Sequence, residues 1–291
     1  MIIDIKYHIA SLAAVFIALG IGILIGTSMI GSDALMKKQE ALIASLQSQY
    51  AALRDENRRM ANELASLKQD DVYQQEFNRA VLPALVRERL LGRKVAVVDV
   101  SNRRDHDPIA SVLREAGAEV ESLTQINLSK FKDTAVKDQV AAYLGKKDRD
   151  LPLNSFLPEF ARFFASAVVT GGGDDLIRQL ESKDVLKITG AYGVPVQDIV
   201  LIGGCDSKEH DYAKVFDLVL VKEWQAAGIK VYGVEDSDVP VSYMRYYQAS
   251  RLTTVDNIDT VYGQVALVQA MAGYPGHYGV KPTAENFLPP F

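Results

Sequence analysis

The residues best suited to metal binding or nucleophilic chemistry are one cysteine and one nearby histidine. Cys205 is the single cysteine of the chain, and His210 follows it in a C-x4-H spacing just after the apolar run DIVLIGG (198–204). A thiolate and an imidazole bind soft metal ions, and a thiol with a base and an orienting group is a nucleophile. Two ligands at this spacing fall short of a metal signature, so a tight turn with an ordinary thiol is the alternative.

A third candidate follows the other strongly apolar run, KVAVVDV (94–100). His106 lies there between Asp105 and Asp107, in a polar loop that begins at Ser101. Such a histidine could bind a cation or relay protons, and the alternative is a solvated loop whose Asp107 caps the next helix. Cys205 and His210 alone would form a weak metal site, unless His106 from the neighbouring strand end joined them.

Gly171, Gly172 and Gly173 form a glycine-rich stretch before a predicted helix. Asp174 and Asp175 follow directly, and they would repel a phosphate. No Lys or Ser/Thr stands at P-loop spacing, so we predict a helix end and a new helix start. No cofactor is predicted, and these constellations are too sparse to favour an enzyme.

The elements around these residues indicate an α/β domain over residues 94–291. Strands are predicted at 94–100, 118–126, 198–204 and 229–235, with helices at 107–118, 132–144, 155–168, 211–228 and 256–273. The last helix is predicted to begin with Asp256 as its cap. Alternating strands and helices predict a mostly parallel, Rossmann-like sheet with helices on both faces. Ligands of such sheets bind beyond the carboxyl ends of the strands, where both loops above lie.

The charge of this domain excludes one class of partner. From residue 94 on there are 21 basic and 27 acidic residues, a net charge of −6. We therefore expect no nucleic-acid partner and no anionic-lipid surface.

The N-terminal part carries a membrane anchor. Residues 9–30 hold no charged residue and would span about 33 Å as a helix, which matches a bilayer core of about 30 Å. Only the short tail 1–8 precedes this run. The alternative to a membrane anchor is a cleaved signal peptide, but the apolar run of a signal peptide is shorter. We expect a single-pass protein of the bacterial cell membrane, with its N-terminus in the cytoplasm and its C-terminal domain outside it. The flanking lysines alone leave the orientation open.

Small residues recur every four positions in this anchor. They allow two membrane helices to pack closely. The stripe consists of Ala10, Ala14, Ala18, Gly22 and Gly26.

A coiled coil is predicted over residues 34–68, after a joint at 31–33. Its apolar residues repeat every seven positions, and Asn57 at an a position would fix the register of a parallel homodimer. The alternative is one amphipathic helix packed on the C-terminal domain. Residues 69–93 are predicted as a helical linker, kinked near Pro83. The a and d positions are Ile43, Leu46, Tyr50, Leu53, Asn57, Met60, Leu64 and Leu67.

Both ends of the chain resemble one bacterial family. The segments YHIASLAAVFIALGIGILIGTSMIG (7–31), TVDNIDTVYGQVALVQAMAG (254–273) and GHYGVKPTAENFLPP (276–290) are similar to the MctB family, whose members are described as copper transporters. The resemblance implies a role in copper homeostasis or efflux, and a pore-forming or outer-membrane assignment. A related branch, the SteB-like proteins, implies a partner role in cell envelope separation during division.

Two functions follow as hypotheses. One is copper homeostasis or transport by a membrane-anchored, non-catalytic dimer. The other is a scaffold that presents its α/β head to an envelope or division protein. The single apolar helix and the dimeric coil favour the scaffold on architecture, and the resemblance favours copper.

Overall fold

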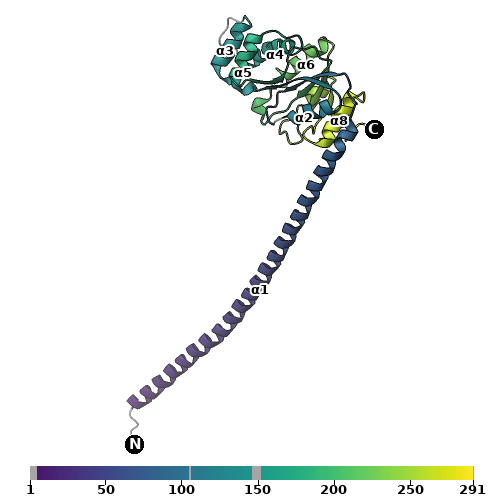
Figure 1. Ribbon diagram of the computed structural model, residues 1–291. Helices are drawn as coiled ribbons and strands as arrows, with labels where there is room; N and C mark the ends of the chain where they lie inside the picture. The colour runs from purple at the N-terminus through teal and green to yellow at the C-terminus, as the bar shows by residue number, and fades with distance from the viewer. Residues whose placement is uncertain (1–4, 105, 146–151, 291) are drawn as a thin grey trace. The chain divides into compact units, whose positions relative to one another are not determined.

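The computed structural model describes residues 5–104, 106–145 and 152–290, with the side chains of 30–34 left aside. The chain divides into two compact units, one ending at Gln74 and one beginning at Gln75. The described residues of the first unit, 5–74, are all helical, and the second unit is the α/β head (Figure 1).

Helix α1 runs from Ile5 to Val86. Its first 25 residues, Ile5–Met29, have a mean hydropathy of 2.6 and no buried residue, so this segment is long and apolar enough to cross a membrane. The predicted joint at 31–33 is wrong, because the backbone is helical there. One glycine costs only about 1 kcal/mol in a helix and does not end it.

Pro83 also fails to break α1. The helix continues one turn beyond it, and the Arg87 backbone N–H donates to the Pro83 carbonyl at 3.0 Å. The end of α1 belongs to the head, since Leu82 and Val86 of α1, and Leu90 in the turn after it, are buried in its core. The head therefore begins earlier than the predicted boundary at residue 94.

The head contains one mostly parallel sheet of seven strands in the order β3-β2-β1-β4-β5-β6-β7. Only β3 is antiparallel to its neighbour β2. The predicted α/β fold is thus confirmed. The strands are β1 (Lys94–Asp99), β2 (Glu119–Ile126), β3 (Leu186–Gly190), β4 (Asp198–Ile202), β5 (Lys230–Val234), β6 (Thr253–Val255) and β7 (His277–Tyr278).

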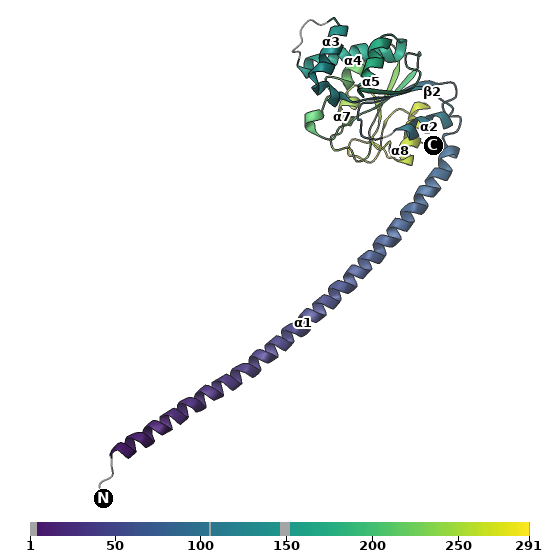
Figure 2. The same cartoon turned by 60° about the vertical axis from the view of Figure 1, so that its left-hand side comes forward.

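Helices cover both faces of this sheet. Figures 1 and 2 show α2 and α8 on one face and α4 and α5 on the other. The α-helices of the head are α2 (Asp107–Glu115), α3 (Thr134–Tyr143), α4 (Leu153–Thr170), α5 (Asp174–Ser182), α6 (Asp217–Ala226), α7 (Met244–Ala249) and α8 (Val261–Met271).

Each face has its own hydrophobic core. One is rich in aromatic residues: Phe160 of α4 packs against Phe131, Phe156 and Phe216 with ring centroids 4.9–6.1 Å apart. On the other face, apolar residues of α2 and α8 pack with the end of α1. A sheet buried on both faces explains why its central strands are continuously apolar.

Three helix starts differ from the sequence prediction. The residue before α2 is His106, and Asp107 is the first helical residue rather than the cap. Helix α8 begins at Val261 with the Thr260 side chain as its cap, because Asp256 instead accepts hydrogen bonds from the C-terminal tail. Helix α6 begins at Asp217, later than the predicted residue 211. The glycine-rich stretch does separate two helices, α4 and α5, as predicted.

Candidate functional site

The candidate site lies where the direction of the sheet connections reverses. Strand β1 pairs with β2 on one side and with β4 on the other, both in parallel. The carboxyl ends of β1 and β4 therefore lie next to each other, and ligands of open α/β sheets bind at this kind of position. The two loops singled out in the sequence follow these two strands.

The structure brings two of the three candidate metal ligands together. Cys205 and His210 line one pocket, which His106 does not line. Ser207 joins the pair: the Cys205 thiol donates to its carbonyl at 3.1 Å, and its hydroxyl lies 3.2 Å from His210 Nδ1. Burial raises the pKa of the Cys205 thiol, despite hydrogen bonds that favour the thiolate. The thiol is therefore held in its neutral form.

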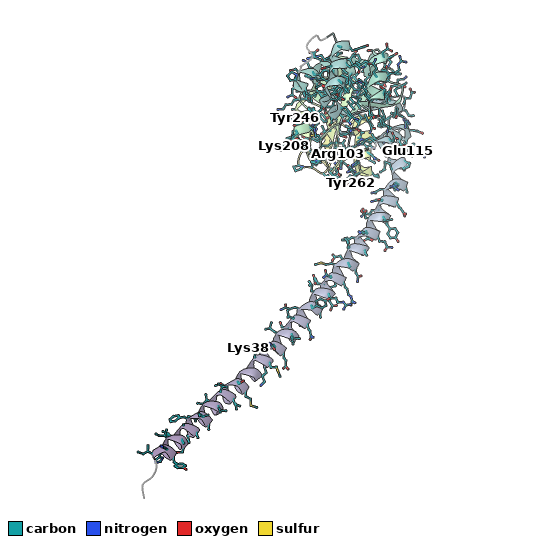
Figure 3. The ribbon with its side chains drawn as sticks, turned by 90° about the vertical axis from the view of Figure 1, so that its left-hand side faces the viewer. Lys38, Arg103, Glu115, Lys208, Tyr246 and Tyr262 are labelled. Carbon is teal, nitrogen blue, oxygen red and sulfur yellow. The ribbon has the colours of Figure 1, made fainter. Side chains whose placement is uncertain are left out.

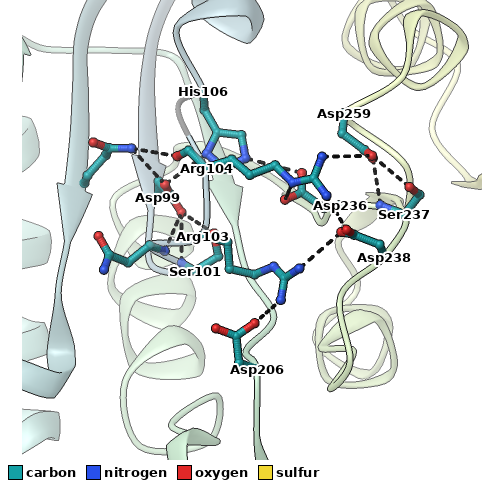
Figure 4. Close-up of polar contacts among 12 residues, drawn as sticks. Asp99, Ser101, Arg103, Arg104, His106, Asp206, Asp236, Ser237, Asp238 and Asp259 are labelled. Carbon is teal, nitrogen blue, oxygen red and sulfur yellow. Dashed lines mark hydrogen bonds and ion pairs between the residues drawn. The ribbon is translucent and has the colours of Figure 1, made fainter.

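His106 is 3% exposed and lies between two buried carboxylates. Its Nδ1 lies 2.9 Å from Asp99 Oδ2 and its Nε2 lies 3.3 Å from Asp236 Oδ1 (Figure 4). Burial lowers the pKa of His106, but the hydrogen bonds to Asp236 and Asp99 outweigh this effect and raise the pKa to about 9. The imidazole is therefore a cation at neutral pH with a proton on each nitrogen, which a metal ligand could not keep. Asp105, its other predicted neighbour, lies outside the described residues.

The loop after β1 is fixed by the last residue of that strand. Asp99 Oδ1 accepts hydrogen bonds from the Ser101 backbone N–H at 2.9 Å, the Ser101 hydroxyl at 2.7 Å and the Asn102 backbone N–H at 3.2 Å. Asn102 has a positive φ of 49°, which asparagine tolerates. This turn directs the following side chains across the strand ends.

Two arginines then join β1 to its neighbours. Arg103 pairs with Asp206 after β4 and, at 3.2 Å, with Asp238 after β5. Arg104 pairs with Asp238 and lies 3.3 Å from Asp236 and 3.7 Å from Asp259. We name this set the strand-end network. It consists of Asp99, Arg103, Arg104, His106, Asp206, Asp236, Asp238 and Asp259 (Figure 4).

The sequence prediction missed the acidic half of this network. Asp236, Asp238 and Asp259 come from loops after β5 and β6, and each follows its strand within a few residues. Their position after apolar strands is the signal that could have identified them. Within the described residues, no group of three or more His, Cys, Asp or Glu side chains is arranged to hold a metal ion.

The C-terminal tail closes the neighbouring strand ends. Lys281 Nζ donates to Glu235 Oε1 and to the Asp236 carbonyl, both at 2.7 Å. Glu235 is fully buried and also accepts from the Tyr243 backbone N–H at 2.8 Å. The two carboxylate oxygens of Asp256 accept from backbone N–H groups at 2.7 and 3.0 Å. The residues of both C-terminal segments singled out in the sequence thus hold each other in place.

Two comparisons place the chain among known proteins. A family profile described as "Copper transport outer membrane protein, MctB" matches residues 2–289. Proteins named "Copper transporter MctB" from Mycobacterium tuberculosis (strain H37Rv) and Mycobacterium bovis are each 23% identical over 318 aligned positions, which cover 95% of this chain and 96% of the relative.

Proposed function

The chain belongs to the MctB family, and on that premise we propose that it serves copper homeostasis or transport as a membrane-anchored, non-catalytic dimer. The match covers both the apolar helix and the head, so the proposal concerns the whole chain. We place the N-terminus in the cytoplasm and the head outside it, because a short tail before a single span usually stays inside.

The observation that carries the dimer is the exposure of the heptad positions. Ile43, Leu46, Tyr50, Leu53, Met60, Leu64 and Leu67 are each between 54% and 69% exposed. Side chains project from α1 on all sides, and nothing else in its own unit covers them (Figure 3). Burying such residues stabilises a coiled coil by roughly 1.5–3 kcal/mol for each large side chain. A second copy, aligned in parallel by Asn57, would cover this apolar seam.

Disulfide cross-linking in membranes tests this arrangement. In a Cys205→Ser background, Leu53→Cys at a d position should give a disulfide-linked dimer under mild oxidation. Asp55→Cys is the matched control. It lies at an f position, on the side of the helix away from the seam, and should not give a disulfide-linked dimer. Equal cross-linking of the two variants, or none at position 53, would contradict the parallel dimer.

A scaffold that presents the head to an envelope or division protein is the second candidate. The strand-end network favours the scaffold over direct metal binding. Its arginines, His106 and aspartates are paired with one another rather than arranged around a metal ion. On this hypothesis any copper phenotype is indirect. We therefore expect no tight, stoichiometric Cu(I) binding by the chain.

Calorimetric titration of the purified full chain with Cu(I) under reducing conditions separates the two candidates. Cys205→Ser and His210→Gln are the ligand variants, and Ser45→Ala in α1 is the control. Submicromolar one-to-one binding that disappears in Cys205→Ser would overturn the scaffold and make copper a direct ligand of the head.

A further inference from the structure

The pocket between the ends of β1 and β4 has features of a ligand site. Its volume is about 170 Å³, close to a cavity of about 150 Å³ that holds a benzene-sized molecule. It lies at the reversal of sheet connections, where ligands of open α/β sheets bind. Its lining comes from the loops after β1, β2 and β4, from the start of α6, and from Tyr243 just before α7. The polar side chains of this lining are Ser101, Asn102, Asn127, Ser129, Cys205, Asp206, His210, Tyr212, Asp217 and Tyr243.

Asp217 is the unusual member of this lining. It is 1% exposed, and its Oδ2 accepts a hydrogen bond from the Tyr247 hydroxyl at 2.5 Å. Its Oδ1 is buried and has no hydrogen-bond partner. Burying a carboxylate oxygen without a hydrogen-bond donor costs free energy. A ligand in the pocket that donates a hydrogen bond to this atom would remove that cost.

The charges around Asp217 determine which donor fits. Asp211 adds negative charge near it, whereas Asp206 at the pocket lining is paired with Arg103. His210 is held by Lys132, whose Nζ lies 2.8 Å from its Nε2. The Tyr243 hydroxyl donates to the His210 carbonyl, and the Tyr247 hydroxyl donates to the other carboxylate oxygen of Asp217, Oδ2. A cationic donor is therefore favoured over a neutral or anionic one.

We propose that this pocket binds a small organic ammonium ion, with an ammonium N–H donating to Asp217 Oδ1. The ligand has on the order of six to eight non-hydrogen atoms, as the pocket volume allows. Asn102, Asn127 and Ser129 also line the pocket and offer polar groups, and Leu128 and Tyr212 add apolar surface.

The protonation of Asp217 agrees with this assignment. Burial raises its pKa to about 7, although the Tyr247 hydrogen bond acts in the opposite direction. The carboxyl group is thus poised to ionise near neutral pH when a cation arrives. Cys205 and His210, the candidate copper ligands, line the same pocket, but the proposed contact is made by Asp217, which is not one of them. A failure of the copper proposal and a failure of this one are therefore distinguishable.

Saturation-transfer NMR on the full chain in detergent tests the proposal. The probes are n-alkylammonium ions with about six to eight non-hydrogen atoms, the size that the pocket volume allows, and the alcohols and carboxylates of the same chain lengths serve for comparison. We expect the ammonium ions to bind at least about ten-fold more tightly than the alcohols, and the carboxylates not to bind, as a charge-assisted hydrogen bond predicts.

Asp217→Asn keeps the shape of the side chain and an acceptor for Tyr247, and it should reduce ammonium affinity by about ten-fold or more while alcohol binding stays unchanged. Asp175→Asn on α5 removes an exposed charge elsewhere and should change neither. Equal binding of the three probe classes, no ammonium binding, or unchanged ammonium affinity in a folded Asp217→Asn variant would overturn the proposal. If that variant fails to fold, the comparison of probes on the unaltered chain still decides.

Discussion

At the residue scale, the least expected feature is a protonated histidine enclosed by carboxylates. His106, Asp99 and Asp236 are all 3% exposed or less. Buried charges are tolerated only when they are paired, and removing one partner of such a pair typically costs about 3–5 kcal/mol. The strand-end network therefore ties the loops after β1, β5 and β6 into one structure.

The raised pKa of His106 makes the stability of the head depend on pH. The pKa is about 9 in the folded head and 6.5 for an unperturbed histidine. Its stabilisation is thus complete below about pH 6.5 and is lost as the pH rises through about 9, with a total of ~3 kcal/mol. Urea unfolding followed by the fluorescence of the single, buried Trp224 measures it.

The variant His106→Gln isolates this contribution. It should be less stable than the unaltered chain at pH 6. The difference in free energy of unfolding between the two proteins should then decrease by ~3 kcal/mol between pH 6.5 and 9. His210→Gln, on the half-buried pocket histidine, is the control for loss of a histidine elsewhere. A gap that stays constant across this range would show that His106 is not the titrating group.

Gly279 supports the C-terminal tail through a close contact. Its φ is +141°, and a Cβ atom there would lie 1.9 Å from Asp256 Oδ1. Gly279→Ala should therefore destabilise the head by more than the ~1–2 kcal/mol of a left-handed backbone alone. Gly228→Ala is the matched control, because its φ of +79° is also positive but no atom lies within 4 Å of the added Cβ. Equal losses of unfolding free energy for the two variants would contradict the role of the Asp256 contact.

At the element scale, α1 is one continuous helix with two kinds of surface along its length. Ile5–Met29 is apolar on all sides, whereas the following turns carry an apolar seam with polar flanks. The proposed dimer gives Asn57 a role in register. Asn57→Leu should raise the thermal midpoint of the coiled coil but loosen its specificity. Circular dichroism melting and sedimentation of α1 peptides covering residues 34–74 measure both, with Asn62→Leu at an outward position as control. An unchanged midpoint and a single dimeric species would argue against Asn57 in the seam.

At the scale of the whole molecule, the head needs residues that precede its first strand. Arg93 forms a two-pronged ion pair with the fully buried Asp198, at 2.5 and 2.6 Å, and also donates to the Met271 carbonyl. Leu82, Val86 and Leu90 are buried before it. The head is therefore a folding unit that includes the last turns of α1.

Two fragments test this boundary. A fragment of residues 75–291 should unfold cooperatively. A fragment of residues 94–291 lacks Leu82, Val86 and Leu90, and the loss of any two of these buried side chains should by itself lower the free energy of unfolding by roughly 3–6 kcal/mol. The loss of Arg93 adds the cost of an unpaired buried carboxylate. Urea unfolding monitored by Trp224 compares the two. Equal stability would mean that the end of α1 is dispensable.

The sequence by itself determined the elements whose signals are local. The apolar segment near the N-terminus and the strands β1, β2, β4 and β5 follow from hydropathy and periodicity, and their predicted bounds lie close to the observed ones. The heptads are also a local pattern, and the coiled coil that they indicate stays a prediction. The short strands β3, β6 and β7 have two to five residues and were missed, because so short a segment carries little periodicity and owes its conformation to its neighbours.

Only the tertiary structure decided what the polar residues do. Cys205 and His210 share a pocket because they are close in the chain, whereas His106 is held away from them by Asp99 and Asp236. Asp217 was not predicted as a site residue, and it lines the pocket only because α6 begins beside the end of β4. Contacts between residues about 100 or more positions apart depend on strand order, which a single sequence does not encode locally.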